Sequence, residues 1–242
     1  MRKHYLAGAM FLTILSFLLT SCGWRSVKGN GEIATSVRKE GSFKSVKAAG
    51  SFDVYFSQAV ENEIKIEADE NLMKYIITTV ENGVLKIKTR NGVNIRPTQH
   101  VKVFVKSPQF AEVSLAGSGN MIAETKIVST EKIILGIAGS GDIKIAEVDA
   151  PKVVVKIAGS GKAEGGGTTK DLEIEVAGSG DVLMKELKAE NVKINIAGSG
   201  NVWVFASMKL DVRVAGGGDI HYYGNPADIK SKSAGSGNLI KE

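Results

Sequence analysis

A recurring tetrapeptide limits what this chain can fold into more than any other feature of its sequence. Ala-Gly-Ser-Gly begins at Ala116, Ala138, Ala158, Ala177, Ala197 and Ala234, and the variant Ala-Gly-Gly-Gly begins at Ala215. The intervals between successive starts are 22, 20, 19, 20, 18 and 19 residues. Self-similarity at this period indicates a solenoid, in which each repeat stacks only on its neighbours.

Each repeat combines two short strands around the glycine-rich corner. Residues 172–176 alternate apolar and polar side chains before one corner, and a polar residue and a second strand, residues 181–184, follow it. This alternation predicts strands with one buried and one exposed face. We therefore expect an all-β fold, a single-stranded right-handed parallel β-helix with coils of about 20 residues. A hairpin meander is the alternative, but regular corners favour coils that stack in register.

The columns of residues that this stacking creates have consistent chemistry. Two columns are expected to face inward: Val153, Leu172, Val192, Leu210 and Ile229 in one, and Met121, Ile143, Ala163, Val182, Val202, Ile220 and Leu239 in the other. Outward residues of successive coils alternate in sign: Glu173, Lys193, Asp211 and Lys230, with Lys156 one coil before Glu175. Such neighbours form favourable pairs in a parallel stack.

The N-terminal half has the same elements in a less regular form. Ala49-Gly50-Ser51-Phe52 resembles a corner, Asn82-Gly83 predicts a tight hairpin turn, and Asp69 is a candidate cap for a helical turn. We expect one domain over residues 41–242, with irregular coils over residues 41–110 that also cap the stack and regular Gly-Ser-Gly coils over residues 111–242.

The extreme N-terminus has the features of an export signal. A basic start is followed by an apolar run from Leu6 to Leu19 and by Leu19-Thr20-Ser21-Cys22. This pattern resembles a bacterial lipobox, so residues 1–21 are predicted to be a lipoprotein signal peptide and Cys22 the lipidated residue. An ordinary secretory signal is the alternative. Residues 22–40 are interpreted as a polar tether. The expected location is the cell envelope, at the outer membrane, with periplasmic and surface orientations both open.

Composition excludes several classes of function. The chain of 242 residues has one cysteine and three scattered histidines, so neither a disulfide framework nor a Cys- or His-based metal site is expected, and no cofactor is predicted. The net charge of +5 includes Arg2 and Lys3 of the leader. Basic and acidic residues are interspersed along the rest of the chain, which argues against nucleic-acid binding.

The corners create two further columns. Their serines are Ser118, Ser140, Ser160, Ser179, Ser199 and Ser236. The polar residues that follow include Asn120, Asp142, Asp181, Asn201, Asp219 and Asn238. No histidine recurs beside the serines to act as a base, so catalysis is disfavoured. Acids do not adjoin one another in the second column, which favours a structural ladder over a calcium site.

Aromatic residues suggest a binding surface. Strand parity places Leu183, Trp203 and His221 in one outward column and Phe205 and Tyr223 in the next, although aromatic residues are only 6% of the chain. Exposed aromatic faces can hold sugar rings or a protein partner. The alternatives are that the C-terminal tail or a second subunit covers them, or that Tyr222 faces outward instead of Tyr223.

These motifs together resemble a known family. The lipobox, the Phe43-Lys44-Ser45-Val46 strand, the hairpin over residues 79–85, the Gly-Ser-Gly-Asn/Asp corners and Tyr223-Gly224-Asn225-Pro226 are similar to the "putative auto-transporter adhesin, head GIN domain" family of Bacteroidetes envelope proteins. The resemblance implies a non-catalytic adhesin-like module that binds a glycan or a protein. A β-helix carbohydrate-active enzyme of the polysaccharide lyase type and a purely structural envelope protein are the alternatives.

Overall fold

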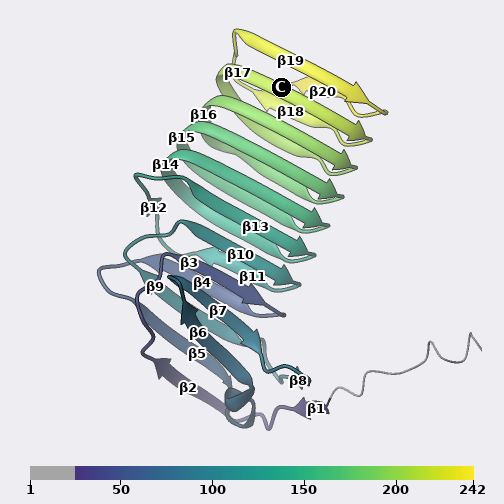
Figure 1. Ribbon diagram of the computed structural model, residues 1–242. Coiled ribbons are helices and arrows are strands. Elements are labelled where there is room, and N and C mark those ends of the chain that lie inside the picture. The colour runs from purple at the N-terminus through teal and green to yellow at the C-terminus, as the bar shows by residue number, and fades with distance from the viewer. Residues whose placement is uncertain (1–24) are drawn as a thin grey trace, which may run out of the picture.

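The chain forms a parallel β-solenoid of about six turns (Figure 1). The computed structural model describes residues 25–242 and is all-β, with 69% of the residues in strands. Parallel bridges join residues about 20 positions apart, as the corner spacing predicts. The predicted all-β solenoid class is therefore confirmed.

The regular part of the solenoid runs from β10 to the C-terminus. Its strands are β10 (Glu112–Gly117), β11 (Asn120–Ala123), β12 (Ile127–Val128), β13 (Ile133–Gly139), β14 (Asp142–Gly159), β15 (Lys162–Gly178), β16 (Asp181–Gly198), β17 (Val202–Gly216), β18 (Ile220–Tyr223), β19 (Asp228–Ala234) and β20 (Leu239–Lys241). Ala158 lies opposite Ala138 on one side and Ala177 on the other. The corners thus stack in register along one edge of the molecule.

The corner glycines are required by the closeness of the coils. Gly198 has φ of 139°, a conformation that side chains with a Cβ rarely adopt. A Cβ at Gly198 would overlap the carbonyl oxygen of Gly178, and one at Gly200 would overlap that of Gly180. Each corner therefore leaves room only for backbone.

The interior is filled by the predicted apolar columns. Leu172, Val192 and Leu210 are buried, as are Ala163, Val182 and Val202 in the second column. Burying each large aliphatic side chain contributes about 1.5–3 kcal/mol. Ile229 departs from the prediction, because it is 44% exposed. It lies on β19 in the last coil, where no further coil covers it (Figure 1).

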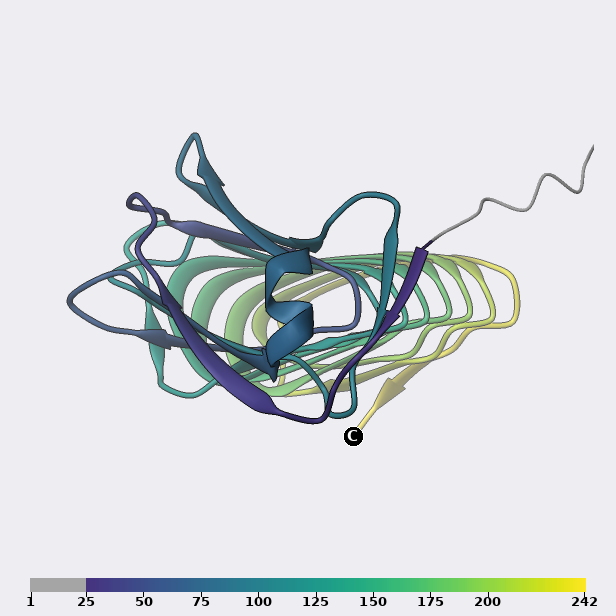
Figure 2. The same cartoon turned by 90° about the horizontal axis from the view of Figure 1, so that it is seen from below.

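The N-terminal part changes from parallel stacking to antiparallel pairing. Its elements are β1 (Arg25–Lys28), β2 (Ile33–Arg38), β3 (Ser45–Ala49), β4 (Asp53–Gln58), β5 (Glu63–Asp69), η2 (Glu70–Tyr75), β6 (Ile76–Glu81), β7 (Val84–Thr89), β8 (Val93–Arg96) and β9 (Lys102–Ser107). β3 and β4 pair in parallel with β10 and β11. β6 and β2 pair antiparallel with β7 and β5. Figure 2 shows η2 across the end of the solenoid. This region, residues 25–107, is called the cap.

The predicted polar tether over residues 22–40 is wrong for residues 25–38, which form strands. β1 pairs in parallel with β8, and β2 pairs antiparallel with β5. In β2, exposed and half-buried residues alternate, and the large apolar residues Ile33 and Val37 are on the exposed side. Backbone pairing with β5, and not an apolar face, therefore holds this strand in place. The hairpin turn at Asn82-Gly83 is confirmed, since both residues have positive φ and Glu81 pairs with Val84.

Asp69 precedes the helical turn but does not cap it through its side chain. Its buried carboxylate accepts hydrogen bonds from the backbone N–H of Gly31 at 2.8 Å, and from the backbone N–H and hydroxyl of Thr98 at 2.9 and 2.7 Å. Burial alone would raise the pKa of Asp69, but these hydrogen bonds outweigh it and lower the pKa. Asp69 therefore fastens two distant segments of the cap together.

The predicted signal peptide and Cys22 lie outside the described residues. Among residues 25–242, no helix is long and apolar enough to cross a membrane.

Candidate functional site

The polar residues after the corners form a hydrogen-bonded column. Asp181 Oδ1 accepts from the backbone N–H of Asn201 at 2.9 Å, and Asp219 Oδ1 accepts from the backbone and side chain of Asn238 at 2.9 and 3.0 Å. The column begins one coil earlier than the sequence indicated, because Asn120 Nδ2 donates to Asp53 Oδ1 at 2.7 Å. Asp142 joins the column by accepting from the backbone N–H of Lys162. These side chains bind neighbouring coils to one another.

The corner serines contribute through their backbone. The N–H groups of Ser140, Ser160 and Ser199 donate to the carbonyls of Gly117, Gly139 and Gly178 at 2.9–3.0 Å. The six corner serines are exposed: Ser118, Ser140, Ser160, Ser179, Ser199 and Ser236. Residues 25–242 contain no group of three or more histidine, cysteine, aspartate or glutamate side chains arranged to hold a metal ion.

The aromatic residues of the last coils lie together on the outer surface. The rings of Trp203 and His221 stack with their centroids 5.0 Å apart and their planes at 6°. The register places Leu183 beside Trp203, and Phe205 beside Tyr223. All five side chains are half-buried. We call Leu183, Trp203, Phe205, His221 and Tyr223 the aromatic patch.

Polar groups surround this patch. Lys188 Nζ lies 4.2 Å from the ring centre of Phe205, and Lys185 Nζ lies 5.9 Å from that of Tyr223. His221 Nδ1 is 2.6 Å from a carboxylate oxygen of Glu242, so the C-terminal residue borders the patch. Tyr222 points inward and is only 8% exposed, whereas Tyr223 points outward. The alternative parity for the two tyrosines is therefore wrong.

A second aromatic stack, which the sequence analysis missed, lies on the same face. Tyr55 and Phe104 stack with centroids 5.2 Å apart, and Lys65 Nζ is 4.4 Å from the Phe104 ring centre. Tyr55 belongs to the outward column that continues through Ile122 to Leu183 and Trp203. The signal available in the sequence was the corner at Ala49, which fixes the parity of Tyr55.

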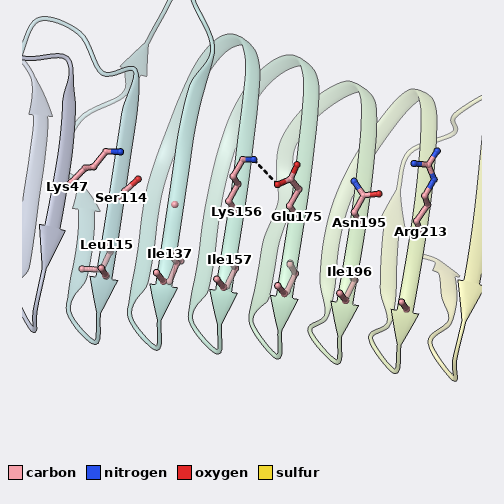
Figure 3. A pocket seen from close by; sticks show the side chains of 18 of the residues that line it. Lys47, Ser114, Leu115, Ile137, Lys156, Ile157, Glu175, Asn195, Ile196 and Arg213 are labelled. Atoms are coloured by element: carbon pink, nitrogen blue, oxygen red, sulfur yellow. Dashed lines mark hydrogen bonds and ion pairs between the residues drawn. The ribbon is translucent and has the colours of Figure 1, made fainter. Parts of the chain in front are cut away.

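A long groove crosses the strands on another face of the solenoid, with a volume of about 980 Å³ (Figure 3). Its floor is the column of alanines that open the corners, all of them exposed. In register these are Ala49, Ala116, Ala138, Ala158, Ala177, Ala197, Ala215 and Ala234. We call this feature the alanine groove.

The rim of the alanine groove carries more positive than negative charge. Its charged side chains are Lys47, Lys86, Lys88, Lys156, Glu175, Arg213 and Lys232. Lys156 Nζ and Glu175 Oε2 are paired at 2.7 Å near the middle. At the end beside the cap, Lys86 lies opposite Lys47 and Lys88 lies opposite Ala49. Lysines therefore gather where the column of alanines stops.

The predicted alternation of outward charges is only partly realised as ion pairs. Glu173 accepts hydrogen bonds from Lys152 at 2.8 Å and from Lys193 at 3.1 Å, and these lysines lower its pKa to about 2. Lys193 thus pairs across coils as expected. Asp211 and Lys230 lie side by side in register, but each forms its ion pair within its own strand, with Arg213 and Asp228.

These features define a parallel β-solenoid with long outer faces suited to binding. The chain belongs to the family described as "putative auto-transporter adhesin, head GIN domain", whose model matches residues 42–226. The family supports a non-catalytic binding module and suggests a protein of the cell envelope or surface.

Three crystal structures from Bacteroidetes have similar folds. A "putative adhesin" from Bacteroides fragilis is 21% identical, with a TM-score of 0.83 over 89% of this chain and 100% of that one. A "putative lipid binding protein" from Parabacteroides distasonis is 27% identical, with a TM-score of 0.75 over 90% and 100%. A "putative adhesin" from Parabacteroides merdae is 22% identical, with a TM-score of 0.72 over 90% and 99%. No curated protein matches the chain.

Proposed function

We propose that this chain is a lipid-anchored, non-catalytic binding module of the cell envelope that takes a glycan or protein partner on its aromatic patch. The observation that carries the proposal is the Trp203–His221 stack, which is half-buried on the outer surface. Core packing does not account for it, because strand parity turns both rings away from the interior. Flat aromatic surfaces with polar edges suit contact with sugar rings or peptide groups.

The charged neighbours of the patch support the same role. Lysines over Phe205 and near Tyr223 add hydrogen-bond donors next to apolar surface. Within the patch, Trp203 and Tyr223 are of the residue types that most often dominate binding energy. The uniformly short corners argue against the polysaccharide lyase alternative, since a catalytic groove needs acids and bases brought together by longer loops.

The test is the double variant Trp203→Ala/Tyr223→Ala, assayed on a glycan array and for adhesion of cells that display it. Removing a contact hot spot costs about 2 kcal/mol or more, so we expect roughly thirtyfold weaker binding. Tyr75→Ala is a matched control, because it removes a half-buried aromatic residue from the cap. A double variant that folds normally and keeps all binding shown by the wild type would contradict the proposal.

Lipid anchoring has its own test. Cys22→Ala is expected to release the domain from the membrane fraction and to abolish incorporation of labelled lipid. A wild-type chain that takes up no labelled lipid, with a variant that stays membrane-bound at unchanged mobility, would show that the lipobox interpretation is wrong.

Lipid binding is a second candidate function. It is favoured by the alanine groove, whose floor is a column of exposed methyl groups. One similar structure also bears the name "putative lipid binding protein". This function uses a different face from the aromatic patch, so the two are separable by mutation.

A further inference from the structure

The alanine groove has a composition that the fold alone does not require. Strand positions that face solvent favour β-branched and aromatic residues, and alanine is depleted there. Here eight successive positions of one exposed column are alanine. Any longer side chain in this column would fill the groove. The repeated choice of the smallest methyl-bearing residue keeps a straight apolar channel open.

The floor of the groove offers no hydrogen bonds to an occupant. The strands beneath it are paired on both sides, Ala158 with Ala138 and Ala177, so their backbone groups are used between coils. A peptide could not extend the sheet from this face, and the hydroxyls of a sugar would find no partners on the methyl groups. An alkyl chain has no hydrogen bonds to lose on such a floor, and the transfer of its apolar surface out of water favours binding.

The length and the charges of the groove further limit which class of ligand it can bind. Strand spacing of about 4.8 Å makes the column from Ala49 to Ala234 roughly 34 Å long. Six of the seven charged side chains on the rim are cationic, so the rim favours an anionic over a cationic occupant. Lys88 occupies the position in the column after Ala49, and it forms no ion pair among residues 25–242, whereas Lys47 and Lys86 alongside are paired with Glu112 at 2.9 Å and Glu81 at 2.6 Å. An anionic group is stabilised at this end.

We propose that the alanine groove binds a single-chain amphiphile, with its alkyl chain along the alanines and its anionic head group at Lys88. The inference rests on the second candidate function and specifies its site, the orientation of the ligand and the charge of its head group. It is independent of the aromatic patch.

Palmitate and its uncharged glycerol ester, monopalmitin, test the proposal by calorimetric titration of the purified protein below the concentrations at which they aggregate. Ala116→Leu/Ala138→Leu places two larger side chains in the groove, two and three strand spacings or about 10 and 14 Å from Lys88, and is expected to weaken palmitate binding at least tenfold. Ala146→Leu/Ala227→Leu is the matched control, since it makes the same change at two exposed alanines outside the groove, and it should bind palmitate as the wild type does.

The head group has a separate arm. Lys88→Glu should weaken palmitate about tenfold and change monopalmitin less than twofold, whereas Lys170→Glu, at an exposed lysine away from the groove, should change neither. Equal palmitate binding by the wild type and Ala116→Leu/Ala138→Leu, or equal effects of Lys88→Glu on both ligands, would overturn the proposal.

Two further outcomes separate this proposal from the proposed functions. Binding of phosphatidylglycerol vesicles without binding of palmitate would overturn the groove assignment and leave lipid binding standing. Trp203→Ala/Tyr223→Ala is expected to keep palmitate binding, and loss of palmitate in that variant would place the alkyl chain on the aromatic patch and overturn the groove assignment.

Discussion

The regular coils and the cap are held together in different ways, although they form one continuous stack. In the regular coils, backbone meets backbone: a Cβ at Gly117, Gly139 or Gly198 would overlap the carbonyl oxygen of the coil before it. In the cap, the turn glycines Gly31 and Gly83 also have positive φ, yet nothing lies within 4 Å of a Cβ at either. Glycine is therefore needed at the corners because the coils pack closely there, and at Gly31 and Gly83 of the cap because of the turn conformation.

In the cap, hydrogen bonds from individual side chains hold neighbouring segments together, whereas in the coils repeated contacts between equivalent residues do so. Arg38 donates from Nη1 to the carbonyl of Ile76 at 2.7 Å and from Nη2 to that of Met73 at 3.2 Å. Asn71 and Asp69 join the N-terminal strands to the turn in the same way. Such contacts are each made once, so the cap depends on single residues, whereas the coils distribute their stability over many equivalent contacts.

The largest effect is expected from a charge in the regular core. Ile194 is fully buried, and Ile194→Asp would bury a carboxylate with no partner. We expect a loss of about 4 kcal/mol or more in the free energy of unfolding, measured by urea denaturation. Lys170→Asp, at an exposed position, should change it by less than about 0.5 kcal/mol. An unchanged melting temperature for Ile194→Asp would mean that the side chain can turn outward.

A matched pair of glycine substitutions addresses the contrast directly. Gly198→Ala combines an unfavourable φ with overlap against the preceding coil, so about 4 kcal/mol is expected from strain and overpacking together. Gly83→Ala meets only the conformational penalty, about 1 kcal/mol. Equal losses for the two variants in urea denaturation would contradict the view that the corners are limited by contact between coils.

The cap should be most sensitive at Asp69. Asp69→Ala removes the charged acceptor of the part-buried hydrogen bonds from the N–H groups of Gly31 and Thr98, at a cost of about 2 kcal/mol. Hydrogen exchange at those two amides should accelerate while the amides of β15 and β16 keep their protection. Asp69→Asn, which retains one acceptor oxygen, should be intermediate. Uniform loss of protection along the whole chain would show that the cap and coils unfold as one unit.

The same residue gives the cap a dependence on pH. Hydrogen bonds hold the pKa of folded Asp69 below its ordinary value of 3.8. The stabilisation is therefore complete above that value and is lost as the pH falls through the lower, folded pKa. Exchange at the Gly31 and Thr98 amides is expected to rise below pH 4 in the wild type and to be insensitive to pH in Asp69→Ala, after correction for intrinsic exchange.

The smallest effect is expected from the charged surface of the coils. Glu173→Gln removes ion pairs with Lys152 and Lys193 that are partly exposed to solvent, so the loss is about 0.5 kcal/mol. The pKa of Glu173 falls from 4.5 to about 2 because of these lysines, so its contribution disappears as the pH drops through that interval. Added salt should reduce the difference between wild type and variant, and a difference that grows with salt would contradict the ion-pair explanation.

The fold of the regular coils could be predicted from the sequence, whereas that of most of the cap could not. The period of the corners, with the parity of Leu172 or Val182, was enough to predict the parallel coils, because every coil repeats the same local solution. The hydrogen-bond partners of Asp69, Gly31 and Thr98, lie 38 and 29 residues away along the chain, and no repeated pattern in the sequence predicts these contacts. For this reason the strands over residues 25–38 were mistaken for a tether.

Of the two candidate binding surfaces, the sequence predicted the aromatic patch but not the alanine groove. Parity was enough to bring Trp203 and His221 together, because both lie at the same position after a corner. The alanine groove escaped prediction although its residues are part of the repeat itself. Ala158 and its equivalents were read as corner residues, and their shared exposure became visible only with the coils stacked.

The unbroken register of the corners also bears on how such a chain can change its length. At the corners, each coil from β14 to β17 pairs with the coil before and the coil after in the same register, and the register shifts only in the returning segments, as between Met184 and Lys188. Duplicating or deleting one repeat of the gene would therefore leave two compatible surfaces in contact. Each such event would lengthen or shorten the outer faces by about 4.8 Å without disturbing the cap. The length of the solenoid can thus change during evolution in steps of one coil.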